Sequence, residues 1–229
     1  MVSLAEKMAA NLDMSAFGKA EELKKRLWFT VLALIVFRLG TFIPLPGIDP
    51  KILADIFSRN SNGILGMFNM FAGGALERMT IFALNIMPYI SASIILQLGQ
   101  SVVPSLAALK KEGEAGHRKI VHYTKVLTVL ITIIQGYGIA VGLEGMVGSA
   151  GLSAVVMPGF VFKFTTIVSL VGGTMFIVWL GDQITSRGVG NGSSLIITVG
   201  IIANIPTALA QTFELGRVGS MSLWVILLL

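Results

Sequence analysis

The stretch MTIFALNIMPYISASIILQLGQSVV (Met79–Val103) decides the fold of this chain. It contains no charged residue and is long enough for an α-helix to cross the hydrocarbon of a bilayer, which takes roughly 17–25 mostly apolar residues. Four other apolar blocks meet the same criterion: Leu27–Ile43, Val126–Gly142, Phe160–Leu180 and Ser193–Thr212. The sequence therefore predicts an all-α, polytopic helical membrane protein with five complete transmembrane helices.

A sixth apolar block begins near Met221 and is still apolar at Leu229, where the sequence ends. About nine residues of helix cover only about 14 Å, roughly half of the hydrocarbon thickness. We expect this block to be the start of a sixth transmembrane helix, and the chain to be a piece of a longer protein.

The composition agrees with lipid as the solvent. Hydrophobic residues make up 54% of the chain and charged residues 13%, whereas a soluble domain carries about 25% charged residues. Cysteine is absent, which excludes disulfides and thiolate metal sites. The two histidines, His117 and His122, lie in a basic stretch without acidic or sulfur ligands at zinc-like spacing. We expect no metal and no cofactor.

Lysine and arginine set the predicted orientation, because they are enriched in the short cytoplasmic loops of membrane proteins. With the N-terminus inside, the cytoplasmic side holds Lys7, Lys19, Lys24, Lys25, Arg26, Lys110, Lys111, Arg118, Lys119, Lys125 and Arg187. The outer side then holds Arg38, Lys51, Arg59, Arg78, Lys163 and Arg217. This imbalance favours a cytoplasmic N-terminus. Residues 1–26 would be either an amphipathic helix at the cytoplasmic surface or a solvated tail.

The centres of the predicted spans lack ionisable side chains, and this bears on function. Asp182 and Glu77 lie at span ends, and Arg38 lies near the outer end of the first span. Ion-coupled transporters place such groups within the membrane to bind the driving ion. No nucleophile motif of a membrane enzyme occurs, and the run RGVGNG (Arg187–Gly192) lacks the Lys-Ser/Thr of a phosphate loop. A passive conduit is favoured over a coupled transporter or an enzyme, and a packing scaffold stays open.

The second predicted span carries polar or helix-breaking residues at membrane depth: Asn85, Pro88, Ser91, Ser93, Gln97 and Gln100. Pro88 has no amide proton and would free the carbonyl of Leu84, so the sequence predicts a kink within this span. Ile86 and Ile90 are four residues apart and share one helix face. The pattern suits a pore wall and a polar helix–helix seam equally well.

A short apolar segment, ILGMFNMFAGGAL (Ile64–Leu76), lies between the first two spans. It is too short to cross the bilayer and is interrupted by Gly73 and Gly74. The residue types predict either a re-entrant element or an external loop that packs on the protein, and do not choose between them.

Five motifs read together go beyond composition. They are FRLGTFIPLPGID (Phe37–Asp49), MFNMFAGGAL (Met67–Leu76), FALNIMPYISASII (Phe82–Ile95), KKEGEAGHRK (Lys110–Lys119) and WLGDQITSRGVGNG (Trp179–Gly192). In this order and spacing they closely resemble the SecY family, the central subunits of the bacterial protein-translocation channel. The resemblance covers nearly the whole chain. It implies a ten-helix channel built as an inverted repeat, of which this chain would supply the first five-helix half and the start of the sixth helix.

The resemblance also implies roles for particular residues. An aliphatic ring would narrow the pore at Ile86, Ile90 and Ile197, and Ser91 and Ile94 would face a lateral gate. Residues 27–213 would hold transmembrane helices 1–5, and residues 214–229 an external loop and the start of the sixth helix. The segment 64–78 would be a plug in the outer funnel, with Ile64, Leu65, Met67, Phe68, Asn69, Met70, Phe71, Gly73 and Gly74 as its characteristic residues.

The implied function is that of a pore-forming subunit, not an enzyme, in the bacterial cytoplasmic (inner) membrane. It would pass unfolded secretory proteins across the membrane and release membrane proteins sideways into lipid. The implied partners are the SecE and SecG subunits, the SecA motor ATPase, the ribosome, nascent polypeptides with their signal sequences, and membrane lipid, with no direct DNA binding. Two positions depart from the family pattern: Asn85 stands where glycine is common, and Ser193 where an aliphatic residue is common.

Overall fold

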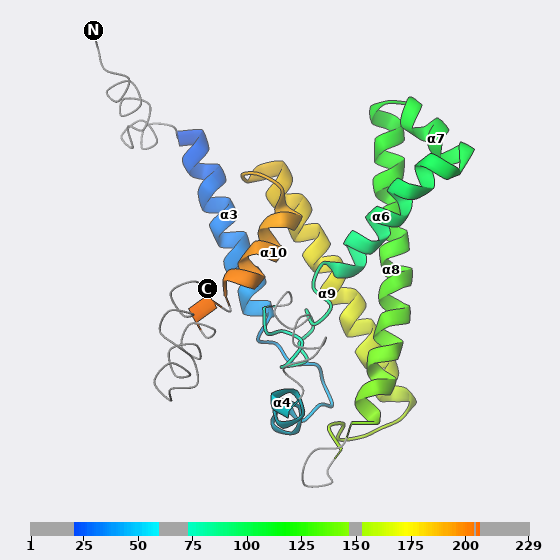
Figure 1. Cartoon of the computed structure of the whole chain (residues 1–229). Helices are drawn as coiled ribbons and strands as arrows, with labels where there is room; N and C mark the ends of the chain where they lie inside the picture. The colour runs from blue at the N-terminus through cyan, green and yellow to red at the C-terminus, as the bar shows by residue number, and fades with distance from the viewer. Residues whose placement is uncertain (1–20, 60–72, 147–152, 204, 207–229) are drawn as a thin grey trace, which may run out of the picture.

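The computed structural model describes residues 21–59, 73–146, 153–203 and 205–206, and this part of the chain is helical (Figure 1). The helices are α3 (Glu21–Gly40), α4 (Pro50–Arg59), α6 (Met87–Val102), α7 (Pro104–Lys111), α8 (Glu114–Glu144), α9 (Phe160–Arg187) and α10 (Gly192–Ile202). Within the described ranges, β structure is limited to isolated bridges between Pro44 and Thr80 and between Ile48 and Val155. The all-α prediction is confirmed.

The predicted third and fourth spans correspond to α8 and α9, both long and apolar enough to cross a membrane. α8 begins at Glu114, so the basic residues that precede the third predicted span are also helical. α3 begins at Glu21 and ends at Gly40, which covers most of the first predicted span. α10 ends at Ile202, and residues 207–212 of the fifth predicted span lie outside the described part.

The prediction of a continuous second span with a kink at Pro88 is wrong. Residues 79–86 are not α-helical, and α6 begins only at Met87, which places Pro88 in its first turn. A proline is well tolerated there, because the first amides of a helix have no intrahelical acceptor. The carbonyl of Leu84 is not left free, since it accepts a hydrogen bond of 3.3 Å from the Met87 amide.

The backbone at Asn85 adopts a conformation that favours glycine, the residue that the family resemblance implies for this position. Asn85 has φ +50° and is buried. This left-handed conformation suits glycine, and asparagine is among the few other residues that adopt it readily. The departure noted in the sequence therefore keeps the same backbone geometry.

α9 lies in the middle of the described helices and packs against α8, α10 and α3 (Figure 1). α8 buries small residues at intervals of four: Thr124, Thr128, Thr132, Gly136 and Ala140. Gly136 lies directly against Ile167 and Leu170 of α9. Small residues at a helix interface let two backbones approach closely, which is how helices associate where lipid removes the hydrophobic driving force.

Large apolar side chains remain exposed along the outer helices. They include Leu27, Trp28, Val31, Leu32, Ile35, Val36 and Leu39 on α3, and Val126, Leu130, Ile134 and Tyr137 on α8. A soluble monomer rarely exposes apolar patches of this extent. Together with the long apolar helices, these faces are those of a protein that lies in a membrane.

Substitutions at Asn85 test the left-handed backbone. Asn85→Gly is expected to leave stability unchanged or raise it, whereas Asn85→Val should lower it by about 1–2 kcal/mol, the cost of placing a side chain with a Cβ in this conformation. The measurement is thermal unfolding of the full-length protein in detergent. Equal loss of stability in both variants would contradict the backbone assignment and point to the amide side chain instead.

Candidate functional site

The non-helical segment 79–86 leads into α6, and its backbone is bonded to the connection that follows α3. The Leu45 amide donates to the carbonyl of Met79 at 2.9 Å, and the Ile81 amide donates to the carbonyl of Ile43 at 3.1 Å. Non-helical backbone at membrane depth is tolerated only where it is buried in protein or lines a cavity. These two hydrogen bonds give part of the backbone of segment 79–86 partners within the protein, and the partners come from residues that are distant in sequence.

A glycine on α9 makes room for the same segment. A Cβ on Gly173 would collide with the backbone carbonyl of Ile81, whereas the neighbouring Gly172 has open space at that position. Beside this contact, Phe82 stacks between Phe37 of α3 and Phe176 of α9, with ring centroids 6.0 Å and 5.9 Å apart. The segment is thus wedged between α3 and α9.

The three predicted ring residues meet in one central apolar cluster, although they come from α10 and from both sides of the start of α6. Ile86 is completely buried and belongs to the cluster, whereas Ile90 and Ile197 are partly buried and pack against the cluster from its edge. The buried members of the cluster are Ala33, Phe37, Phe82, Ile86, Ile177, Val178, Leu180, Ile184 and Ile196. The buried polar side chains of the described part are threonines and Asn85, and none of the buried side chains there is charged. Sequence spacing had related only Ile86 to Ile90; the contact with α10 is tertiary.

Of the predicted plug residues, only Gly73 and Gly74 are among the described residues. Both have left-handed backbones, with φ +66° and +80°. The guanidinium of Arg38 on α3 donates a hydrogen bond of 2.8 Å to the Gly73 carbonyl. The remaining plug positions (Ile64, Leu65, Met67, Phe68, Asn69, Met70 and Phe71) lie outside the described part.

The predicted gate residues lie on α6. Ser91 is half-buried and Ile94 is exposed. Ser91 also lines a cavity of about 630 Å³ between α4, the segment that precedes α6, α6 itself and α8. The lining residues are apolar apart from Asn85, Ser91 and Gln135, and none of them is charged. Such a surface can accommodate an apolar segment and offers no group that would bind an ion.

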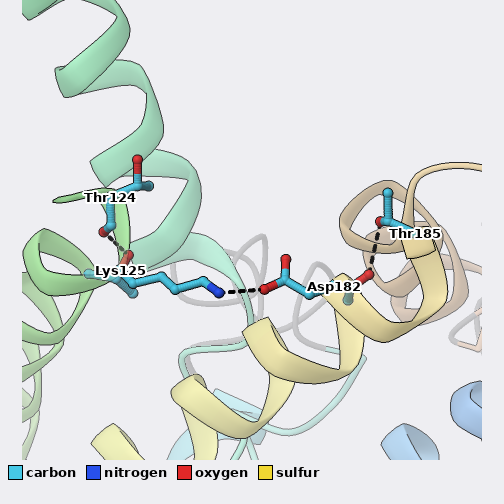
Figure 2. Close-up of polar contacts among 6 residues, drawn as sticks. Thr124, Lys125, Asp182 and Thr185 are labelled. Atoms are coloured by element: carbon cyan, nitrogen blue, oxygen red, sulfur yellow. Dashed lines mark hydrogen bonds and ion pairs between the residues drawn. The ribbon is translucent and has the colours of Figure 1, made fainter. Parts of the chain in front are cut away.

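Two ion pairs join α8 and α9, and the sequence analysis missed both. Lys125 contacts Asp182 with a distance of 2.7 Å between the ammonium nitrogen and a carboxylate oxygen (Figure 2). At the opposite ends of these helices, Lys163 lies 3.0 Å from Glu144, whose carboxylate also accepts a 2.8 Å hydrogen bond from the Gly159 amide. The available signal was that each residue stands at or near the end of a predicted span, on consecutive antiparallel helices.

Both ion pairs join the third and fourth spans, so neither lies between the second and fifth spans, where a coupling site would be expected. None of the four side chains belongs to the central apolar cluster. Within the described residues, no group of three or more metal-ligating side chains comes together.

Comparison with known proteins places this geometry in a family. The SecY family profile matches residues 80–229. The chain is 56% identical over 214 residues to the protein translocase subunit SecY of Escherichia coli K12, which covers 93% of this chain and 48% of that protein. The corresponding subunit of Buchnera aphidicola subsp. Acyrthosiphon kondoi is also 56% identical, with 93% and 60% covered. That of Rickettsia bellii is 53% identical, with 89% and 47% covered.

Solved structures share the fold. One described as the structure of a protein conducting channel superposes with a TM-score of 0.55 at 18% identity, over 85% of this chain and 38% of that one. Sec61 in the canine ribosome–channel complex from the endoplasmic reticulum gives the same values. The chain therefore has the fold of this class of helical membrane proteins.

Within that class, the chain belongs to the SecY family. The family profile covers more than half of the chain, and the relatives are well above the identity at which a family is secure. The chain spans about half the length of the curated relatives it matches.

Substitutions of two neighbouring glycines test the close approach of the non-helical segment 79–86 to α9. Gly173→Ala should destabilise the full-length protein by about 1–3 kcal/mol, because the added methyl group displaces backbone that cannot be repacked. Gly172→Ala is the matched control and should be neutral or stabilising, since its Cβ meets no neighbour. The measurement is thermal unfolding in detergent. Similar behaviour of the two variants would contradict the close approach of Ile81 to α9.

Proposed function

We propose that this chain forms the first half of the pore of a protein-conducting channel. The observation that carries the proposal is the meeting of Ile86, Ile90 and Ile197 in one uncharged cluster at the start of α6. The relatives are named protein translocase subunits, and the solved structures of the same fold are protein-conducting channels. The channel passes unfolded secretory proteins across the membrane and releases membrane proteins sideways into lipid.

An aliphatic constriction suits this task on physical grounds. A narrow ring of branched apolar side chains dewets and blocks ions, yet it holds no specific binding site that would retain a passing chain. A transported polypeptide has no fixed chemistry, so a charged or hydrogen-bonding waist would delay some sequences more than others. The uncharged central cluster meets this requirement, and Ile86 would be uncovered when the ring opens.

Two further elements belong to the proposal. α6 and α8 form one side of the lateral gate, with Ser91 and Ile94 on its face, and the apolar cavity beside Ser91 is suited to an apolar segment on its way into lipid. The segment 64–78 acts as the plug, anchored at Gly73 by the guanidinium of Arg38. Residues 1–26 lie on the cytoplasmic side, residues 27–213 hold the first five transmembrane helices, and residues 214–229 continue into a sixth.

The cellular setting is part of the same proposal. The chain acts in the bacterial cytoplasmic membrane with its N-terminus inside, together with SecE and SecG, and it receives polypeptides from the SecA motor or the ribosome. One solved structure of the same fold is a ribosome–channel complex. Because the motor supplies the free energy from outside, the subunit itself performs no catalysis and needs no nucleotide or cofactor.

Polar substitution of the ring tests the pore. Ile90→Asn, and likewise Ile86→Asn, should raise the ion conductance of the resting full-length channel several-fold, because an amide hydrates the constriction. Planar-bilayer recording of the reconstituted complex provides the measurement. Ile95→Asn is the matched control, since Ile95 lies on the same helix but is exposed. Conductance at the control level in both ring variants would refute the ring assignment.

Deletion of the proposed plug tests the second element. Removal of residues Ile64–Ala75 from the full-length protein should make the closed channel leakier, while export continues. Ion leak and export of a secretory protein are measured on the same vesicles. Complete loss of export would show that the segment is required for the fold instead.

A further inference from the structure

The interface between α8 and α9 is made largely of small side chains on the α8 side. The small residues of α8 described above form this interface, and Gly136 packs against α9 without a side chain of its own. The threonine hydroxyls are bonded within α8: Thr124 donates to Ile120, Thr128 to Thr124 and Thr132 to Thr128, at 2.9, 2.7 and 2.7 Å. Their hydrogen bonds therefore do not lock α8 to α9.

The two ion pairs lie at opposite ends of this interface. Glu144 with Lys163 and the Gly159 amide closes the end where the chain passes from α8 to α9, and Glu144 is only 18% exposed there. Lys125 with Asp182 joins the two helices toward their other ends, where they diverge in Figure 1. The first pair therefore lies where the connection already holds the helices together, and the second lies where they separate.

Asp182 stands on a firmly held part of the structure. Three residues further along α9, the Thr185 hydroxyl donates to the Gly181 carbonyl at 2.9 Å (Figure 2). The same hydroxyl accepts a 2.9 Å hydrogen bond from the Gly192 amide at the start of α10. These bonds fix the turn between α9 and α10. Lys125 belongs to α8, which packs with α6 and α7 as well as with α9. The three helices α6, α7 and α8 are here named the α6–α8 arm (Met87–Glu144).

We propose that the Lys125–Asp182 ion pair is a tie that sets the angle of the α6–α8 arm against α9 and α10. The arm carries Ile90, Ser91 and Ile94, and α10 carries Ile197, so this angle governs the separation of the two sides of the constriction and the position of the gate-facing residues. Lys125 and Asp182 are positioning residues and contact no transported chain in this role. The consequence for transport rests on the channel function proposed above, whereas the structural tie does not.

The exposure of the pair suits an adjustable contact. Lys125 is 35% exposed and Asp182 is 42% exposed. Ion pairs with this much access to water are weak, and their loss changes a two-state equilibrium by roughly two- to fivefold. The tie would therefore bias the arm toward one angle without locking it, and its removal should leave the overall stability of the protein nearly unchanged.

Distance measurement between spin labels tests the tie directly. The chain has no cysteine, so labels can be placed at Tyr123→Cys on α8 and Ser186→Cys on α9, both exposed, in the full-length protein freed of any other cysteine. Electron–electron resonance in nanodiscs should show a longer or broader distance distribution for Lys125→Met and for Asp182→Asn. The charge exchange Lys125→Asp with Asp182→Lys should restore the original distribution.

A second ion pair on the same helix provides the control. Arg118 and Glu114 are 3.2 Å apart, 79% and 83% exposed, and both lie on α8. Arg118→Met removes a charge near the same helix end but no contact with α9, so the distance distribution should stay at its original position. An unchanged distribution in Lys125→Met, or a shift of equal size in Arg118→Met, would overturn the proposal.

Export by the same variants separates the tie from the channel function. A looser arm should open more readily, so export of a secretory protein with a shortened apolar signal should rise roughly two- to fivefold in Lys125→Met and return to the original rate in the charge exchange. A shifted distance with unchanged export would support the tie and count against the gate function of the arm. An unchanged distance would overturn the tie whatever the export rate, and would leave the channel function standing.

Discussion

Backbone amides and carbonyls at membrane depth must find partners within the protein, and this constraint governs the described structure. Helices satisfy it locally, but the segment 79–86 does not form an α-helix. Its backbone is instead bonded to the connection after α3, and its path is open only because Gly173 of α9 has no side chain. The position of the central apolar cluster follows from this arrangement, since Ile86 is the last residue of the segment and α6 begins directly after it.

The apolar blocks predicted the long helices correctly, because the hydropathy of a segment depends only on its own residues and largely determines whether that segment is stable as a helix in lipid. α8 and α9 fall where the sequence placed the third and fourth spans. Pro88 was misjudged for a reason that is not local. Whether a proline kinks a helix or begins one depends on the preceding backbone, and here that backbone is bonded to Ile43 and Leu45, which are remote in sequence. Asn85 was a usable clue, because asparagine in place of glycine often indicates a left-handed residue.

The sequence identified the residues of the candidate site but did not show how tertiary packing brings them together. Spacing placed Ile86 and Ile90 on one face, yet only the packing of α10 on α9 and α3 brings Ile197 to them. Likewise, hydropathy placed Lys125 and Asp182 at the edges of spans, but pairing depends on the rotation of each helix about its axis. Small residues set that rotation, and a single sequence shows them only as scattered threonines and glycines.

The distribution of charge explains why the fold persists at low sequence identity. Structures at 18% identity share this fold, although few of their side chains are the same. What the channel needs is an uncharged centre, small residues where helices approach, and a backbone that is satisfied where it leaves the helix, and many sequences provide these. Specific polar pairs can then lie outside that centre, as Lys125–Asp182 and Glu144–Lys163 do, where the side chains are partly exposed and water screens their charges.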